Sequence, residues 1–183
     1  MIRGKQVALR SIDRKDLPIL MKWRNRSEFR RYFREYRELN LDMQERWFQN
    51  TVLGDKNTIM FSIVDEKSET LVGCCGLCYI DWLNRNAELS LYIGHENSYI
   101  DLDHYYAEDA CRLLLTYGFE QINLHKIWAE IYDFDAKKEA LFHKFLFRKD
   151  GVLREHHFSD GKWCDSIIWS ILQKDYASQY NIT

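Results

Sequence analysis

The sequence has a single proline, Pro18, and no stretch rich in glycine, serine and proline of the kind that joins domains. Nothing marks a boundary, so we expect residues 1–183 to form one domain, and a hydrophobic content of 46% is ample for its core. No apolar run approaches the roughly 20 residues that a bilayer span requires, and the first residues lack the apolar segment of a secretory signal. We therefore expect a cytoplasmic protein with no membrane partner.

An excess of positive charge is also missing. The net charge is −2, which provides no overall attraction for nucleic acid, and we expect no nucleic-acid partner. One basic stretch, residues 24–37, is interrupted by Glu28 and Glu35. This pattern predicts a solvated helix face rather than an RNA-binding stripe.

The cysteines do not form an even set: there are five, and without export they are expected to stay reduced. The segment Cys75-Gly76-Leu77-Cys78 has the spacing of a zinc or redox motif. It lies in a predicted strand, however, where residues three apart face opposite sides of the sheet and do not converge on one metal. We interpret the cysteines as buried thiols and expect no metal.

The first third of the chain predicts strands and helices in turn. The segment 7–12 is typical of a strand, and Asp13 or Asp16 is placed to cap a helix whose apolar positions share one side. Asp42 predicts the start of a second helix, because Glu45 follows at the spacing of a capping box. Residues 59–64 and 71–80, separated by a polar turn, predict an antiparallel hairpin.

Changes in the spacing of apolar residues along the sequence predict the remaining elements. They are a strand over 87–94, a helix from about residue 105, a strand over 125–132, a helix from residue 136 capped by Asp135, and a hairpin over 152–172. Asp160-Gly161 in that hairpin suits a type I′ turn. The fold class is therefore α/β (α+β), with a central mixed, mostly antiparallel twisted sheet flanked by helices and a C-terminal β-hairpin.

Several phrases, in this order and spacing, resemble GNAT N-acetyltransferases, including those of ribosomal-protein alanines (RimJ/RimL type) and of amino-sugars. The phrases are Lys22-Trp23-Arg24-Asn25, Asp81-Trp82-Leu83-Asn84-Arg85-Asn86-Ala87-Glu88-Leu89, Leu124-His125-Lys126-Ile127-Trp128, and Leu153-Arg154-Glu155 with Asp160-Gly161-Lys162. The resemblance implies the GNAT fold and acetyl-CoA as co-substrate. It also implies direct attack on the thioester by a primary amine, either of a small molecule or of a protein N-terminus.

Glu88 is the candidate general base. Glu88, Ser90 and Tyr92 share the polar face of their strand, while Leu89, Leu91 and Ile93 point the other way. A carboxylate on that face can draw a proton from the amine directly or through water, and Ser90 can position the amine or the water. Two plainer interpretations stay open: a salt bridge for Glu88, and a polar face that is only exposed to solvent.

The resemblance also implies which residues bind the cofactor. From the strand and the later helix they are Leu91, Tyr92, Ile93, Asp135, Lys138 and Phe142. Phe142 stands where related enzymes often place a tyrosine that protonates the departing thiolate, and phenylalanine cannot donate a proton. His143 is a neighbouring titratable group, although a surface role suits it better.

The loop expected to hold the CoA pyrophosphate departs from the family pattern. Its residues are Leu102, Asp103, His104, Tyr105, Tyr106 and Ala107. The pattern places Leu102 at the basic or amide position and Tyr105 at the first glycine, so only Ala107 conforms. Nearby carboxylates, including Asp101, either repel the phosphates or cap the following helix themselves.

Three hypotheses follow from these departures. The first is an active N-acetyltransferase that binds acetyl-CoA through main-chain amides. The second is a GNAT-fold transferase that takes its acyl group from a carrier protein or a tRNA. The third is a non-catalytic binding module. Candidate acceptor-wall residues are Trp23, Arg24, Trp82 and Trp163. Homodimerisation through the sheet edge or the terminal hairpin is left open, because no motif supports it.

Overall fold

The computed structural model describes residues 1–101 and 103–180, and its centre is one eight-stranded sheet in the order β1-β2-β3-β4-β5-β6-β8-β7. The strands are β1 (Ile2–Arg3), β2 (Val7–Ser11), β3 (Ile59–Asp65), β4 (Leu71–Asp81), β5 (Asn86–Ile93), β6 (Lys126–Tyr132), β7 (Arg148–Ser159) and β8 (Lys162–Leu172). The helices are α1 (Leu17–Arg24), α2 (Ser27–Arg30), α3 (Leu41–Trp47), α4 (Tyr106–Thr116), α5 (Ala136–Lys144) and α6 (Gln173–Tyr180), with short 3-10 or π-helical turns between some of them.

All neighbouring strands are antiparallel except β5 and β6, which are parallel. The predicted mixed, mostly antiparallel sheet is thereby confirmed. The parallel pairing joins Asn86–Glu88 to Lys126–Trp128 and stops there, although β5 continues to Ile93 and β6 to Tyr132. The two strands therefore separate directly after Glu88, and this opening positions the site.

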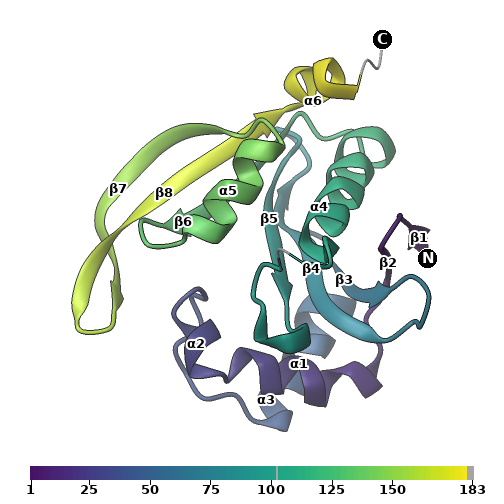
Figure 1. Ribbon diagram of the computed structural model, residues 1–183, viewed down its shortest axis with the longest axis vertical. Coiled ribbons are helices and arrows are strands. Elements are labelled where there is room, and N and C mark those ends of the chain that lie inside the picture. The colour runs from purple at the N-terminus through teal and green to yellow at the C-terminus, as the bar shows by residue number, and fades with distance from the viewer. Residues whose placement is uncertain (102, 181–183) are drawn as a thin grey trace.

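Helices cover the sheet on both sides of the opening. Figure 1 shows α4 and α5 in front of the sheet near β5, with α1, α2 and α3 gathered at the lower end and the long β7–β8 hairpin projecting to the left. The buried side of α4, including Leu113, Leu114 and Leu115, packs on β2, β4 and β5. The core is continuous through the central strands and these helices, because each of them contributes an apolar face to it, whereas β7 contributes no core residue.

Local signals explain several element ends. Asp135 caps α5 as predicted, because its side chain accepts from the backbone N–H of Lys138 at 3.1 Å. Asp160 and Gly161 have φ of 51° and 79°, as a type I′ turn requires. The second helix differs from the prediction: Asn40, rather than Asp42, caps α3 by accepting from the N–H of Met43.

The basic stretch 24–37 is not one helix face, so that prediction is wrong. Helix α1 ends at Arg24, α2 covers only Ser27–Arg30, and the chain then continues as a loop. Asn25 fixes this loop, because its side-chain amide exchanges hydrogen bonds of 2.7 and 2.8 Å with the backbone of Leu39. The arginines of the loop are thereby placed beside the opening of the sheet.

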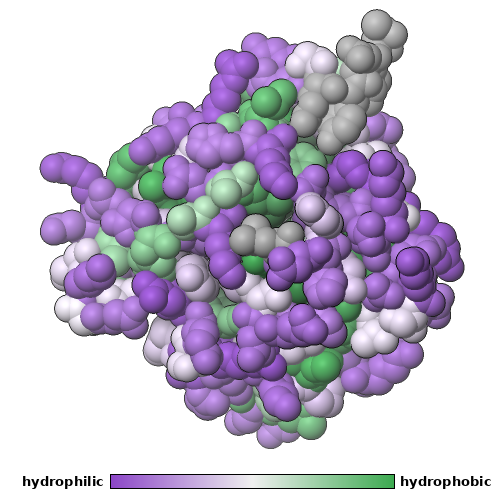
Figure 2. All heavy atoms as spheres, in the orientation of Figure 1, coloured by the Kyte–Doolittle hydropathy of each residue, from purple (hydrophilic) through white to green (hydrophobic). Residues whose placement is uncertain are grey.

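The five cysteines are free thiols; four are buried and Cys78 is partly buried. Burial raises the pKa of Cys75 well above its ordinary value, so this thiol stays protonated and inert. The face drawn in Figure 2 is mostly hydrophilic, with scattered hydrophobic patches. Within residues 1–101 and 103–180, no helix combines the length and apolar character needed to cross a bilayer.

Candidate active site

A cleft of about 610 Å³ opens where β5 and β6 part. Strand β5 contributes Glu88 and the three residues after it, and Lys138 of α5 lies on the same lining. The remaining lining residues are Arg24, Tyr32, Phe33, Arg34, Glu35, Tyr36, Arg37, Trp47, Thr51, Asp55, Thr58, Met60, Cys78, Tyr79, Glu130 and Tyr132. In this cleft the polar face of β5 thus lies beside the loop after α2, which contributes Arg34 and Arg37.

Glu88 lies at the base of this cleft, at the last parallel pair of β5 and β6, and is only 7% exposed. Its carboxylate is held by Arg34, whose Nη1 donates to Oε2 at 2.8 Å while Nη2 donates to Oε1. The same guanidinium bonds Glu130 of β6, from Nε at 3.0 Å and from Nη2 at 2.5 Å. One cation therefore bridges two carboxylates across the parting strands.

The charges of Arg34 and Glu130 are fixed by their surroundings. Burial alone would lower the pKa of Arg34, but hydrogen bonds to Glu88 and the charges of both carboxylates raise it well above its ordinary value. Burial would raise the pKa of Glu130, but hydrogen bonds from Ser166 and Arg34 lower it overall. His156 Nδ1 also lies 3.4 Å from Glu130. At neutral pH the arginine and this carboxylate are both ionised.

A smaller cavity of about 180 Å³ extends the cleft between the N-terminal helices and the sheet. Ser90, Arg24 and Glu35 line both spaces. A hydrogen bond from Arg37 lowers the pKa of Glu35 to about 2, so Glu35 carries a negative charge at neutral pH. Tyr92 is buried and lines only the smaller cavity.

The edge of β5 that faces the opening is partly occupied. The N–H of Ile93 donates to the carbonyl of Tyr99 at 2.7 Å, so this loop residue takes the end of the edge. Peptide groups alternate along a strand, so the backbone of Leu91 faces the same side as that of Ile93. Leu91 lines the cleft, and Ile93 does not.

Lys138 is buried in the same region, with 9% exposure. Its ammonium lies 5.6 Å from the ring centre of Tyr99. Tyr99 in turn stacks on Tyr32 at 4.0 Å and donates its hydroxyl to Asp135 at 2.6 Å. Both oxygens of Asp135 are thereby used, one by Tyr99 and one by the cap of α5.

Phe142 does not reach the cleft, so its expected place beside the cofactor is not met. It is fully buried, with its ring 4.6 Å from that of Phe147 and 6.5 Å from that of Trp169. His143 is exposed and packs against Trp169. Neither residue of this turn of α5 is available to a molecule in the cleft.

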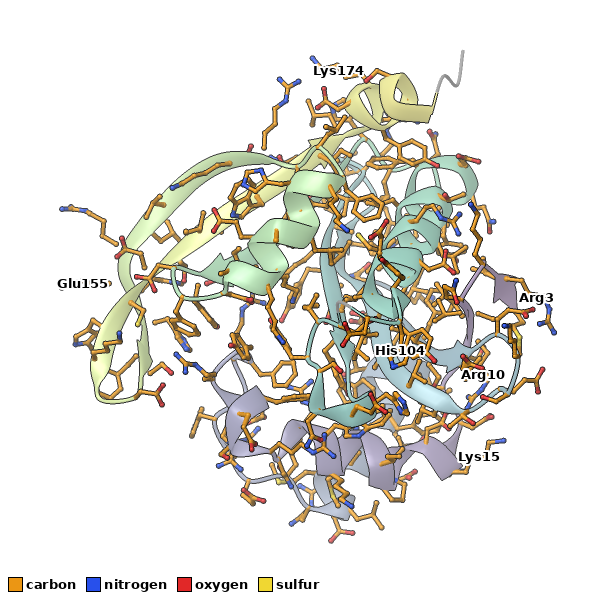
Figure 3. The ribbon with its side chains drawn as sticks, viewed as in Figure 1. Arg3, Arg10, Lys15, His104, Glu155 and Lys174 are labelled. Carbon is orange, nitrogen blue, oxygen red and sulfur yellow. The ribbon has the colours of Figure 1, made fainter. Side chains whose placement is uncertain are left out.

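The loop before α4 is capped from within. The carboxylate of Asp101 accepts from the N–H groups of Tyr106 and Ala107 at 2.8 and 2.7 Å, so of the two geometries left open the capping one occurs. Figure 3 shows His104 near this end of α4. Tyr105 is 56% exposed at φ 59°, and Tyr106 directs its hydroxyl to Asp65. No side chain of the described loop blocks the cleft. Leu102 lies outside the described residues.

The other acidic residues near α4 have partners elsewhere. Asp109 is buried and accepts from the N–H groups of Gln6 and Val7. Glu108 pairs with Lys144 of α5. Asp103 is exposed. These carboxylates and that of Asp101 therefore do not form one cluster of negative charge at the place expected for the CoA phosphates.

Three side chains beside this loop could offer ligand atoms to a metal ion. The donor atoms of His95, Glu96 and His104 lie within 4.8 Å of one another, on an exposed surface. None of the three lines the cleft. The chemistry of the cleft therefore does not involve them.

Of the four expected acceptor-wall residues, only Arg24 lines the cleft, where it lies 4.5 Å above the ring of Phe33. Trp23 is in the core, packed so closely on Gly94 that a Cβ there would overlap its ring. Trp82 and Trp163 are 49% and 60% exposed, away from the cleft. Trp23 is therefore a core residue, and Trp163 belongs to the tip of the β7–β8 hairpin.

The match of this site to acetyl-CoA differs between the two ends of the cofactor. The opening between β5 and β6 offers a free backbone edge at Leu91 and space to Glu88, which fits a thioester on an extended arm. At the helix end, the amides of Tyr106 and Ala107 are already bonded to Asp101. The arm end fits, and the phosphate end is built differently from the family pattern.

Comparison with known proteins agrees with the fold. The family model described as acetyltransferase (GNAT) domain matches residues 6–148. The chain belongs to the GNAT acetyltransferase family. It is an enzyme of that family, an N-acetyltransferase with acetyl-CoA as acyl donor.

Two relatives and one solved structure show how far this likeness extends. The spermidine N(1)-acetyltransferase of Vibrio cholerae is 26% identical over 96% of this chain and 98% of its own. The uncharacterized N-acetyltransferase p20 of Bacillus licheniformis is 29% identical, but the match spans 64% of each chain. The crystal structure of the Vibrio cholerae enzyme with CoA and spermine superposes with a TM-score of 0.84, at 27% identity, covering 93% of this chain and 98% of that one.

Proposed function

We propose that this GNAT enzyme acetylates a primary amine of a small aliphatic polycation of the spermidine class. The observation that carries the proposal is the pair of carboxylates, Glu88 and Glu130, which hold one guanidinium between them where the strands part. The buried Glu88 and the half-buried Glu130 around one cation form a site with the charge that an alkylammonium group needs. The spermidine acetyltransferases that match nearly the whole chain support the same substrate class.

The rest of the cleft suits a long, flexible cation. Glu35 and Asp55 add two further acids to the lining of the cleft. Aromatic rings of Tyr32, Phe33 and Trp47 also line the cleft, and such rings attract alkylammonium groups through their faces. A chain of methylenes with ammonium groups at intervals has the matching pattern.

The proposed chemistry uses residues already in place. Acetyl-CoA supplies an electrophilic thioester carbonyl when it is bound. The backbone of Leu91 holds the acyl arm by its free edge, and Ser90 orients the amine. Glu88 takes the amine proton, directly or through a water, so that the lone pair of the nitrogen can attack. The new C–N bond forms as the C–S bond breaks.

The experiment is a steady-state assay of CoA release with four amines: spermidine, spermine, glucosamine and a peptide with a free N-terminus. We expect kcat/KM to be highest for the polyamines. Glu130→Gln should raise the KM for spermidine about tenfold, the effect of losing roughly 1.4 kcal/mol of binding. Glu139→Gln, on the exposed side of α5, is the matched control. Equal rates for glucosamine or the peptide would contradict the polyamine assignment.

The role of Glu88 has its own test. Glu88→Gln should lower kcat by about a hundredfold at neutral pH, and by less at high pH where more of the amine is already deprotonated. A loss that does not change with pH would remove the general-base role while leaving the substrate assignment intact.

Dimerisation stays a prediction. Phe158 and Trp163 at the tip of the β7–β8 hairpin are 58% and 60% exposed and lie 5.2 Å apart, which supports a contact there. Light scattering of the wild-type protein and of Trp163→Ser would check it.

A further inference from the structure

Lys138 places an ammonium group on the lining of the cleft. The side chain is only 9% exposed, yet among the described residues its Nζ has neither an ion-pair partner nor a hydrogen-bond acceptor. Its one polar contact is the face of the Tyr99 ring, at 5.6 Å. Lys138 also lines the cleft together with Glu88 and Leu91. The unpartnered cation therefore faces the space where the acyl arm fits.

The surroundings explain why this ammonium stays without a partner. Asp135 is the nearest acid on the same helix, but its two oxygens are bonded to the N–H of Lys138 itself and to the Tyr99 hydroxyl. Glu88, on β5, is held by Arg34. The Nζ atom is not one of the fully buried, unpartnered atoms of the described residues, so the ammonium is open to the cleft and can meet a bound molecule there.

The position of Lys138 suits the leaving group of the reaction. Lys138 of α5 and Leu91 of β5 both line the opening between β5 and β6, and Glu88 lies at its base, where the amine proton is taken. The sulfur that leaves develops negative charge in the same opening. Phe142, one helical turn further along, is fully buried and cannot ionise. Lys138 is the ionisable residue that α5 contributes to the lining.

Resting on the proposed function, we propose that Lys138 is the catalytic acid of the transfer: its ammonium donates a proton to the departing thiolate. The amine nitrogen bonds to the carbonyl carbon, the electron pair of the C–S bond goes to sulfur, and one proton passes from Nζ to sulfur. Lys138 is left as a neutral amine and regains a proton from water before the next turnover. Glu88 receives the proton of the attacking amine and releases it to solvent, so charge and protons balance.

The electrostatics favour this transfer. Burial lowers the pKa of Lys138, and the charges of Asp135 and Glu88 offset only part of that effect. Arg34 from the loop after α2 adds to the lowering. Cys111 on α4 stays a neutral thiol because burial raises its pKa, so it places no negative charge beside the ammonium. A lysine that gives up its proton more readily than usual is a better acid toward a thiolate.

The test compares Lys138→Met with wild type using two acyl donors, acetyl-CoA and an aryl thioester whose thiol is much more acidic. A good leaving group needs no proton. We expect kcat with acetyl-CoA to fall about a hundredfold, the loss to be under about fivefold with the aryl thioester, and the high-pH decline of kcat to disappear. Lys137→Met is the matched control, since Lys137 neighbours it on α5 but does not line the cleft and bonds the carbonyl of Ser98.

Several outcomes would overturn the assignment. An equal loss with both donors would mean that Lys138 only shapes the site, and a higher KM for acetyl-CoA with unchanged kcat would make it a donor-binding group. Lys138→Gln, with a thermal melt of each variant, separates these results from misfolding. If wild type releases no CoA with any of the four amines, the proposed function fails and this role fails with it. If wild type is active, the role of Lys138 stands or falls alone.

Discussion

Arg34 and Glu88 lie 54 positions apart in the sequence, yet the guanidinium of one is bonded to both carboxylate oxygens of the other. This contact ties the loop after α2 to the base of the cleft. Arg34 is 47% exposed, so one side of it meets solvent while the other covers the two carboxylates. A cationic substrate that uses Glu88 and Glu130 therefore competes with a cation of the protein itself.

Removing that internal cation should favour the substrate. We expect Arg34→Met to lower the KM for spermidine about tenfold, because an ammonium group then meets two carboxylates without a competitor. The same change should lower the free energy of unfolding by about 1–2 kcal/mol, since it leaves buried charges without their partner. Enzyme kinetics and urea unfolding measure the two effects. Arg3→Met, which breaks the pair with Glu66 away from the cleft, controls for the charge change. A raised KM would show instead that Arg34 orients Glu88 for the substrate.

A second ion pair anchors the N-terminal part of the chain. Asp16 is 3% exposed and accepts from both terminal nitrogens of Arg10 at 2.7 and 2.8 Å, and from Ser62 at 2.8 Å. Figure 3 shows Arg10 beside the first helices. Burial would raise the pKa of Asp16, but the bonds from Arg10, the Asp13 N–H and Ser62 lower it overall.

That carboxylate should contribute to stability above its unfolded pKa near 4 and lose the contribution as pH falls through its lower folded pKa. We expect Asp16→Asn to cost about 3 kcal/mol of unfolding free energy at pH 7, and the gap from wild type to narrow below pH 4. Urea unfolding between pH 3 and 7 measures this difference in unfolding free energy. Asp13→Asn is the control, because Asp13 is exposed and contacts Arg10 only at 3.5 Å. A gap that stays constant with pH would refute the linkage.

Lys138 should affect stability in the opposite direction from most buried residues. Because its folded pKa is lowered, the charged form weakens the fold below that pKa, and the penalty disappears as pH rises to the unfolded value near 10.4. We expect Lys138→Met to raise the unfolding free energy by about 1–2 kcal/mol at pH 7, with the gain shrinking toward pH 10. Thermal melts over this pH range test the prediction. The control variant Lys137→Met should leave the unfolding free energy nearly unchanged. A destabilised Lys138→Met would mean that the ammonium has a stabilising partner.

The sheet could be predicted from the sequence because each strand alternates and each main helix carries one apolar stripe. The short α2 and the loop after it could not, because their course depends on the clamp between Asn25 and Leu39, which no local pattern encodes. The same limit hid Arg34 among charges that resembled a solvated face. Glu130 had a usable signal: it shares the polar side of β6 with Trp128, between the inward residues Ile127, Ala129 and Ile131.

Site residues were predicted unevenly for a related reason. Glu88 and Ser90 were chosen by strand alternation; both line the cleft, and their catalytic roles stay predictions. Tryptophans chosen as walls went to the core or the surface, because side-chain size and shape, rather than sequence order, decide where an aromatic ring packs. Asp101 was recognised as either a repulsive charge or a cap, and only the positions of the Tyr106 and Ala107 amides decide between the two.

The cap formed by Asp101 leads to the last expectation. Its carboxylate occupies the two amides that a phosphate at the start of α4 would use, so the protein's own acid competes with the cofactor there. We expect Asp101→Ala to lower the Kd for CoA about tenfold, as the freed amides turn to phosphate, and to lower the unfolding free energy by about 1 kcal/mol through loss of the cap. Calorimetric titration with CoA measures the first effect, and urea unfolding measures the second.

Asp103→Ala is the control for the cap formed by Asp101. It removes the same charge from an exposed position and leaves the cap intact, so it should change neither the Kd for CoA nor the unfolding free energy. Equal tightening in both variants would show that only overall charge matters, and no tightening in either would show that the phosphates bind away from α4.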